Sequence, residues 1–337
     1  MHLVLATEAQ KAERDRVTHA AWGSPLSVEQ FHQRELRLRA HPWCREGMRT
    51  WLLLAQDGQV LASCETFLTE SWLRGPDGRH VRGDSFSIAS VYTEEALRGH
   101  GYATRLMDLV AAELEATSPR GHAAVLFSDV GAPLYRRSGY HEAPAWDWHL
   151  PSEAQATPIP AASAPATPTS AMPTPAIPSP VTLLGDADVA EAMKRMRRPD
   201  APFYLWPSPE QVDWHLERER IYAELLHRPR PEACGARVGD STALWAMMAR
   251  YGELVVLMLD ARAPEDAAML VAAAREVAHR AGLAKVVLWE EAGTEALVAR
   301  LPGAARVPRD GALPMVRPLR PGLPPAPEVP FPRALWV

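Results

Sequence analysis

A stretch near the middle of the chain, residues 151–180, constrains the fold more than any other feature. It is written "PSEAQATPIPAASAPATPTSAMPTPAIPSP", in which proline, alanine, serine and threonine nearly exclude other residues. Such a composition buries too little apolar surface to offset the entropy of ordering the chain, so we expect an extended, largely polyproline-like linker. The sequence therefore predicts two domains, residues 1–150 and 181–337, each close to the usual domain length.

Composition excludes several classes of function. The formal net charge of −5 argues against nucleic acid as a partner, because a phosphate polymer demands a basic face. The cysteines, Cys44, Cys64 and Cys234, are widely spaced and form no C-x-x-C pair, so neither a disulfide framework nor a metal site is indicated. No basic leader and no bilayer-length apolar run is present, so we expect no membrane partner and a cytoplasmic location. Nothing in the sequence indicates an oligomeric state.

The first unit alternates helix and strand signals. Residues 17–41 have helical periodicity with Ser27 as an N-cap, and residues 49–73 form two apolar runs joined by Asp57-Gly58, a dipeptide suited to a tight hairpin turn. A third strand is expected at 85–93, a fourth at 123–130, and a short helix ends at Gly139. The predicted order is helix, hairpin, strand, helix, strand, helix.

Between the third strand and the long helix lies the loop "LRGHGYA", residues 97–103. The first turn of a helix exposes unpaired N–H groups at the positive end of the helix dipole, which is a suitable place for a phosphate. Gly99 and Gly101 are expected to let the backbone approach that phosphate where a Cβ would collide, and Arg98 adds positive charge. The alternative is a glycine-containing cap of a surface helix, with Arg98 simply solvated.

Two motifs carry a resemblance to a known family. The pattern Arg98-x-x-Gly101-x-Ala103 resembles the acetyl-CoA signature of the GNAT superfamily of N-acetyltransferases, and "LYRRSGY", residues 134–140, resembles its second signature. The resemblance implies the α/β (α+β) class, a GNAT-type mixed sheet flanked by helices, acetyl-CoA as co-substrate and no metal. The cofactor contacts it implies come from Val91, Tyr92, Arg98, Gly99, His100, Gly101, Tyr102 and Ala103. His100 is equally read as an exposed loop residue.

A narrower resemblance covers more of the chain. The phrases "LASCETF", "SVYTEEALRGHGYATRLM" and "VLFSDVGAPLYRRSGY", and residues 206–226, are similar in order to the fungal lysine N-acetyltransferases of lysine breakdown. This resemblance implies a small-molecule amine as partner. Free lysine is the leading candidate for the acceptor, followed by another amine or a protein lysine. The long proline-rich linker departs from that family's pattern.

The resemblance also implies roles in catalysis. Tyr135 occupies the place of the general acid, since a phenol can protonate a departing thiolate; the alternative is a buried tyrosine that anchors its helix. The acceptor amine must lose a proton, yet residues 85–93 contain no carboxylate. Glu65 and Asp129 are the candidate bases, although each is as readily a hydrogen-bonded residue at a strand end. The absent carboxylate keeps open a non-catalytic acyl-CoA-binding or protein-interaction module.

The final residues, "PFPRALWV", are apolar and aromatic instead of polar. Acetyltransferases of the enhanced-intracellular-survival type, which the chain resembles, direct a terminal carboxylate into the active site. We therefore expect Trp336 to anchor this segment by burial and to bring the carboxylate of Val337 near the acceptor amine. The alternative is that residues 333–337 form a last edge strand.

The second unit repeats the order of the first. Strands are expected at 233–239, 242–250, 253–261 and 284–291, and a helix begins near Pro264. The turn before that helix lacks a glycine pair, which predicts a degenerate GNAT-like domain without cofactor binding. Upstream, Trp214, His215, Arg218 and Glu219 recur at helical spacing. They form either a wall of the acceptor pocket, with Arg218 pairing with a substrate carboxylate, or an ordinary amphipathic helix with a solvated charged face.

Overall fold

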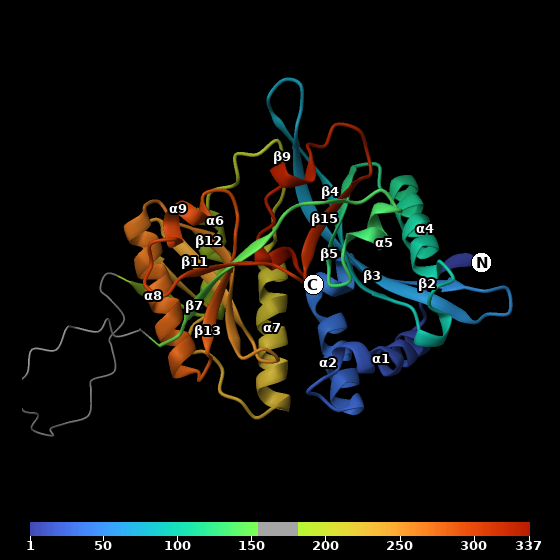
Figure 1. The fold of residues 1–337 in the computed structure, drawn as a ribbon, viewed down its shortest axis with the longest axis horizontal. Coiled ribbons are helices and arrows are strands. Elements are labelled where there is room, and N and C mark those ends of the chain that lie inside the picture. Colours follow the sequence, from blue (N-terminus) through green and yellow to red (C-terminus); the bar gives the residue numbers. More distant parts are fainter. Residues whose placement is uncertain (154–180) are drawn as a thin grey trace, which may run out of the picture.

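The computed structural model describes residues 1–153 and 181–337, so most of the predicted linker lies outside the described residues. Two mixed sheets, each flanked by helices, lie side by side in Figure 1. The first sheet contains β1 His2–Leu5, β2 Met48–Leu54, β3 Val60–Arg74, β4 His80–Tyr92, β5 Gly121–Ser128, β6 His141–Glu142, β9 Phe203–Leu205 and β15 Leu313–Pro318. The second contains β7 Trp146–Pro151, β8 Thr182–Leu184, β10 Gly235–Val238, β11 Ser241–Met248, β12 Glu253–Asp260, β13 Lys285–Trp289 and β14 Ala305–Pro308.

Some of the described helices begin after a residue whose side chain caps the first turn, and others begin without such a cap. The helices are α1 Glu8–Trp22, α2 Val28–Ala40, α3 Pro42–Gly47, α4 Tyr102–Thr117, α5 Ala132–Arg136, α6 Val189–Arg195, α7 Pro209–Leu225, α8 Pro264–Arg280 and α9 Thr294–Val298. The predicted cap Ser27 is confirmed, because its side chain accepts a hydrogen bond from the Gln30 N–H at 3.2 Å. Pro264 is the first residue of α8, also as predicted.

Each sheet has one parallel pair joined by a long helix. In the first sheet the order is β1-β2-β3-β4-β5-β15-β6, with β9 paired to β3, and α4 connects the parallel strands β4 and β5. In the second the order is β14-β7-β13-β12-β11-β10-β8, and α8 connects the parallel strands β12 and β13. The prediction that the second unit repeats the strand–helix–strand order of the first is confirmed.

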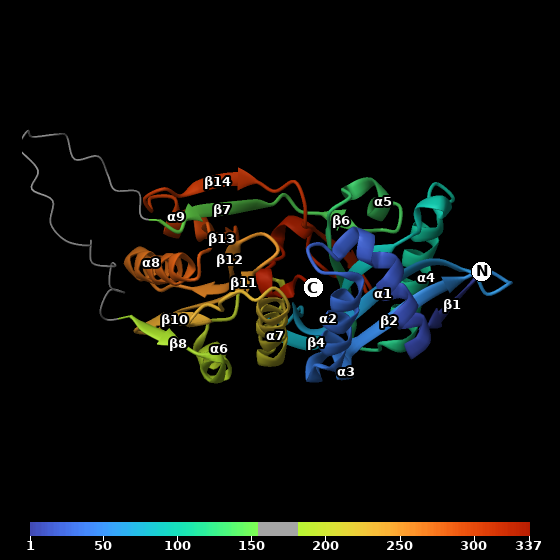
Figure 2. The ribbon, with the colours of Figure 1, turned by 90° about the horizontal axis from the view of Figure 1, so that it is seen from below.

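The two sheets exchange strands. β7 pairs with β13 and β14 in the second sheet, whereas β15 lies between β5 and β6 in the first. Figure 2 shows β7, coloured green, among the orange and red elements of the second half. The sheets therefore do not separate at the predicted boundaries of residues 1–150 and 181–337. The second sheet takes β7 from the first part of the chain, and the first sheet takes β9 and β15 from the second part.

Helix packing places a distinct core in each half. The apolar face of α4, including Leu106, Met107 and Val110, is buried on the first sheet, and Leu270 and Val277 of α8 are buried on the second. Each of these side chains contributes about 1.5–3 kcal/mol by leaving water. The cysteines are buried and unbridged, and the described residues hold no cluster of metal-ligating side chains. Among the described helices, none combines the length and apolarity needed to cross a bilayer.

Candidate active site

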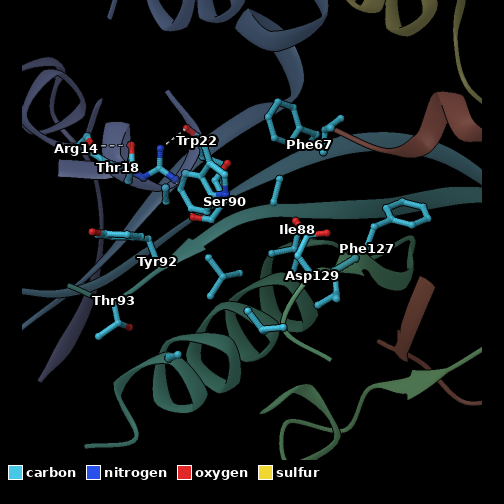
Figure 3. Close-up of a pocket in the computed structure, with 18 of the residues that line it drawn as sticks. Arg14, Thr18, Trp22, Phe67, Ile88, Ser90, Tyr92, Thr93, Phe127 and Asp129 are labelled. Carbon is cyan, nitrogen blue, oxygen red and sulfur yellow. Dashed lines mark hydrogen bonds and ion pairs between the residues drawn. The ribbon is translucent and has the colours of Figure 1, made fainter. Parts of the chain in front are cut away.

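The central strand β4 bends away from its parallel neighbour where the cofactor loop begins. β4 and β5 pair only as far as Ile88 and Leu126, and the register of β4 against β3 shifts between Ala89 and Tyr92. Ser90 lies inside this bulge with a φ of 53°, in the left-handed region. Figure 3 shows Ser90 between Tyr92 and Ile88 along the strand. The two strands therefore open a gap at the end that points toward α4.

Helix α4 presents an uncapped N-terminus beside this gap. Its N-cap, Gly101, has a φ of 77° and no side chain to accept from the first turn, and that turn contains no acidic residue. Gly99 has a φ of 81°, so both glycines are needed for the left-handed backbone. A Cβ at either position would meet no protein atom within 4 Å. The predicted collision of a Cβ would therefore be with a bound phosphate and not with the protein. The free N–H groups suit an anionic ligand.

A cavity of about 680 Å³ follows the gap and reaches the second half of the molecule. It is lined by the predicted cofactor residues Val91, Tyr92, Arg98, Gly99, Gly101, Tyr102 and Ala103, and by the predicted catalytic residues Tyr135, Glu65, Asp129 and Val337. His100 does not line it: the ring is exposed and stacks on Tyr102, with the centroids 5.6 Å apart. The structure thus brings together every predicted site residue except His100.

Tyr135 lies on α5 with its ring almost wholly buried at the cavity wall. Burial raises the pKa of its phenol well above the usual range. The hydroxyl therefore keeps its proton at neutral pH. Tyr135 is buried, as the alternative of an anchoring tyrosine predicts, but its side chain also lines the cavity.

Glu65 is held by an arginine that sequence reasoning missed. Arg14 Nη1 donates to Glu65 Oε1 at 3.0 Å, Nε donates to Ser63 Oγ at 3.1 Å, and Nη2 donates to the carbonyl of Ser90 at 2.8 Å. Arg14 thus ties β3 to the bulge of β4. Burial raises the pKa of Glu65, and the charge of Arg14 acts in the opposite direction.

Two further carboxylates line the cavity. Asp129, which follows β5, accepts a hydrogen bond from the Ala312 N–H at 2.8 Å, and Figure 3 shows it beyond the end of that strand. Glu35 of α2, which the sequence did not single out, pairs with Arg34. Although burial acts to raise it, the Arg34 charge and hydrogen bond hold the pKa of Glu35 below its usual range, so this carboxylate stays ionised.

The last residues are fastened to both halves of the molecule. Gln211 Nε2 donates to the Ala334 carbonyl at 3.0 Å, and Ser87 Oγ donates to the Leu335 carbonyl at 3.3 Å. Residues Arg333–Leu335 form a 3₁₀ turn, so the alternative of a last edge strand is wrong. Figures 1 and 2 both show the C-terminus between the two halves, beside α7.

A ladder of alternating arginine and tryptophan side chains anchors Trp336. The Arg309 and Arg333 guanidinium carbons lie 3.8 and 4.8 Å from the Trp289 ring centroid, and those of Arg333 and Arg218 lie 4.0 and 4.6 Å from that of Trp336. Shielded contacts of this kind are each worth about 1–2 kcal/mol. This ladder places Val337 beside the cavity, packed near Phe67 and Trp214.

Helix α7 forms one wall of the cavity. Trp214 and Arg218 line it, whereas His215 lies 3.0 Å from the Ala334 carbonyl and Glu219 accepts from the Met247 N–H at 2.6 Å. His215 and Glu219 are both buried, so the reading of a solvated charged face is wrong. The pocket-wall alternative is the one that fits Trp214 and Arg218.

Several cavity residues had no signal in the sequence. Arg14, Trp22, Glu35, Arg250 and Tyr251 come from α1, α2 and the turn after β11. Charged residues at helical spacing are usually solvated, so nothing local marked Arg14 or Glu35 as inward-facing. The left-handed backbone of Ser90 could not be predicted either, because serine has no special preference for that conformation.

Comparisons with known proteins match nearly the whole chain. The acetyltransferase (GNAT) family model matches residues 14–140, and the model of the LYC1 GNAT-like C-terminal domain matches residues 160–329. A lysine acetyltransferase of Yarrowia lipolytica is 30% identical over 315 residues, which cover 81% of this chain and 80% of that protein.

Solved structures share the fold at low identity. A conserved protein of Enterococcus faecalis V583, described as a probable N-acyltransferase, superposes with a TM-score of 0.58 and 13% identity, covering 95% of this chain and 72% of its own. A GCN5-related N-acetyltransferase from Anabaena variabilis superposes with a TM-score of 0.56 and 15% identity, and the match covers 95% of this chain and 73% of that protein. At such identities the likeness concerns the fold alone.

Proposed function

Because the chain belongs to the GNAT family of acetyltransferases and is an acetyl-CoA-dependent N-acetyltransferase, we propose that it acetylates the side-chain amine of free lysine or a similar small amine. The observation that carries the proposal is one continuous cavity. It runs from the uncapped start of α4, past Tyr135, to Trp214 and Arg218 of α7. The name of the Yarrowia lipolytica relative, lysine acetyltransferase, supports lysine as the acceptor.

The residues at one end of the cavity fit the co-substrate. Acetyl-CoA supplies the acetyl group as a thioester and carries negatively charged phosphates. The backbone N–H groups that follow Gly99 and Gly101 would hold the diphosphate, with the charge of Arg98 nearby. Val91 and Tyr92, where β4 has left β5, would contact the pantetheine arm.

Tyr135 is proposed as the general acid. Its raised pKa keeps the hydroxyl protonated at neutral pH, which is the state required to give a proton to a departing thiolate. The ring is almost wholly buried at the cavity wall, which favours transfer of this proton to a bound ligand.

A carboxylate is proposed to take the proton of the acceptor amine. A lysine amine has a reference pKa of about 10.4 and is mostly protonated at neutral pH, so it needs a base or a water relay. Glu65, Asp129 and Val337 all line the cavity. Glu65 is engaged by Arg14 and Asp129 by the backbone of Ala312, whereas the segment ending in Val337 is rigidly anchored. We therefore favour the carboxylate of Val337.

The test is release of free coenzyme A with a panel of acceptors. Free amino acids, polyamines, aminoglycosides and lysine-containing peptides are compared by kcat/KM, and mass spectrometry locates the acetyl group. Reactions without acceptor correct for thioester hydrolysis. Lysine acetylated on its side-chain amine with the highest kcat/KM would support the proposal. Acetyl-CoA binding without turnover of any amine would instead favour the non-catalytic module.

A further inference from the structure

The cavity holds more positive charge than its own carboxylates neutralise. Its lining contains seven arginines, Arg14, Arg34, Arg39, Arg98, Arg137, Arg218 and Arg250. The first three form ion pairs, with Glu65, Glu35 and Asp15 respectively. Within residues 1–153 and 181–337, the other four have no carboxylate at ion-pair distance.

These four arginines come from two different places. Arg98 precedes α4, whose start is proposed to hold the phosphates of acetyl-CoA, and Arg137 follows α5, which packs against α4. We assign both arginines to the co-substrate part of the cavity. Arg218 belongs to α7 and Arg250 to the turn after β11, in the second half of the molecule. The co-substrate accounts for uncompensated positive charge at the first place only. The carboxylate of Val337 also lies at the second place, but among the described residues it forms no ion pair with Arg218 or Arg250. Both arginines therefore remain available for an anionic group on the other ligand.

Arg218 has the surroundings of an anion-binding residue. It is half-buried, its guanidinium carbon lies 4.6 Å from the Trp336 ring centroid, and the residue lines the cavity beside Trp214. A guanidinium stacked on a ring keeps its N–H donors free at the edges, where they match a carboxylate. Burial lowers the pKa of Arg218, and the charge of Arg34 acts in the same direction. A desolvated cation without a counter-ion is costly, and a ligand carboxylate would offset that cost.

We propose that Arg218 binds the carboxylate of the amine acceptor, which makes the substrate a free amino acid instead of a polyamine or a lysine within a polypeptide. The inference rests on the proposed acetyl transfer to a small amine and adds which part of that amine the enzyme recognises. Arg250 is exposed and donates to the Trp22 carbonyl at 3.4 Å, so it contributes more weakly, at the rim.

The test removes each charge in turn. Wild type and Arg218→Met are assayed with lysine and with lysinamide, which lacks the carboxylate but keeps both amines. For wild type we expect kcat/KM to be about 10- to 100-fold lower with lysinamide, the usual effect of a hydrogen bond to a charged group. For Arg218→Met we expect a similar loss with lysine and no further loss with lysinamide. Calorimetry with lysine in the presence of coenzyme A should show the same pattern in binding.

Two controls separate the possible outcomes. Arg220→Met removes a surface arginine of the same helix, paired with Glu217, Asp213 and Asp186, and should leave the lysine-to-lysinamide ratio unchanged. Arg218→Lys should restore part of the ratio. If Arg218→Met slows both substrates equally, the residue acts by holding Trp336 and the carboxylate role is overturned.

The same experiment distinguishes this inference from the proposed function. Equal use of lysine and lysinamide by wild type would overturn the carboxylate site and leave lysine acetylation standing. If wild type uses neither, 6-aminohexanoate and its amide provide a second pair with the same logic. A preference for peptide lysines over all free amino acids would overturn both proposals.

Discussion

Tyr135 and Tyr140 are buried neighbours, with ring centroids 6.0 Å apart, yet only Tyr135 lines the cavity. This difference allows a matched test of the proposed general acid. Tyr135→Phe should lower kcat by about 100-fold, the usual scale for loss of acid catalysis, while acetyl-CoA affinity stays nearly constant. Tyr140→Phe should leave kcat unchanged. Steady-state kinetics check both, and an unaltered kcat in Tyr135→Phe would assign the proton to solvent or another group.

Gly101 is expected to be critical for acetyl-CoA because it forms the start of α4. Gly101→Glu should weaken acetyl-CoA binding by about 10- to 100-fold, since it places negative charge against the phosphates. Backbone strain is controlled by Gly58→Glu, at a hairpin position with a φ of 90° and equally open space. That control should bind normally in calorimetric titration. Equal affinity of wild type and both variants for acetyl-CoA would show that the start of α4 does not bind the phosphates.

At the scale of elements, contacts of Ala334, Leu335 and Trp336 fix the segment that ends in Val337. Residues added after Val337 therefore displace its carboxylate without deleting any packed side chain. Adding a few glycines and serines after Val337 should abolish most activity if the carboxylate is the base, while the melting temperature and acetyl-CoA binding hold. The same residues added before Met1, which is 56% exposed, serve as the control. Full activity of the C-terminally extended protein would return the base to Glu65 or Asp129.

Helix α7 should make the protein sensitive to acid. Burial, together with the charge of Arg333, lowers the pKa of His215 to about 3, against about 6.5 in an unfolded chain. Between these values the unfolded state binds more protons, so the free energy of unfolding falls as pH drops from about 6.5 toward 3, by at most about 1.4 kcal/mol per unit.

His215→Gln, which keeps a donor for the Ala334 carbonyl, should flatten this fall. Thermal melts from pH 7 to pH 5 check it, and the exposed His279→Gln should behave as wild type. An identical slope in His215→Gln would show that other groups set the acid sensitivity.

Elements whose signals lie within a few residues were predictable from sequence. The hairpin at Asp57-Gly58, the cap Ser27 and the turn at Gly101 each depend on local backbone preferences. The pairing of Arg14 with Glu65 depends on two residues 51 apart, and neither carries information about the other. Short strands such as β6 and β9 were missed for the same reason, because their stability comes from the strand they pair with.

At the scale of the whole molecule, the exchange of β7 and β15 couples the two sheets. Neither sheet is complete without a strand from the other part of the chain, so the halves should not unfold independently. Differential scanning calorimetry should show one transition, with equal calorimetric and van't Hoff enthalpies. Two separable transitions would mean that each sheet survives the loss of its exchanged strand.

The exchanged strand β15 also determines when the enzyme takes shape during its own synthesis. β5 leaves the ribosome long before β15, and until then one edge of an apolar strand, including Ala124 and Leu126, has no partner. Unpaired apolar edges are the places where nascent chains associate with one another. The cavity and the segment that anchors Trp336 are likewise completed only by late residues. We therefore expect activity to appear only after residues 313–337 have been made and have packed.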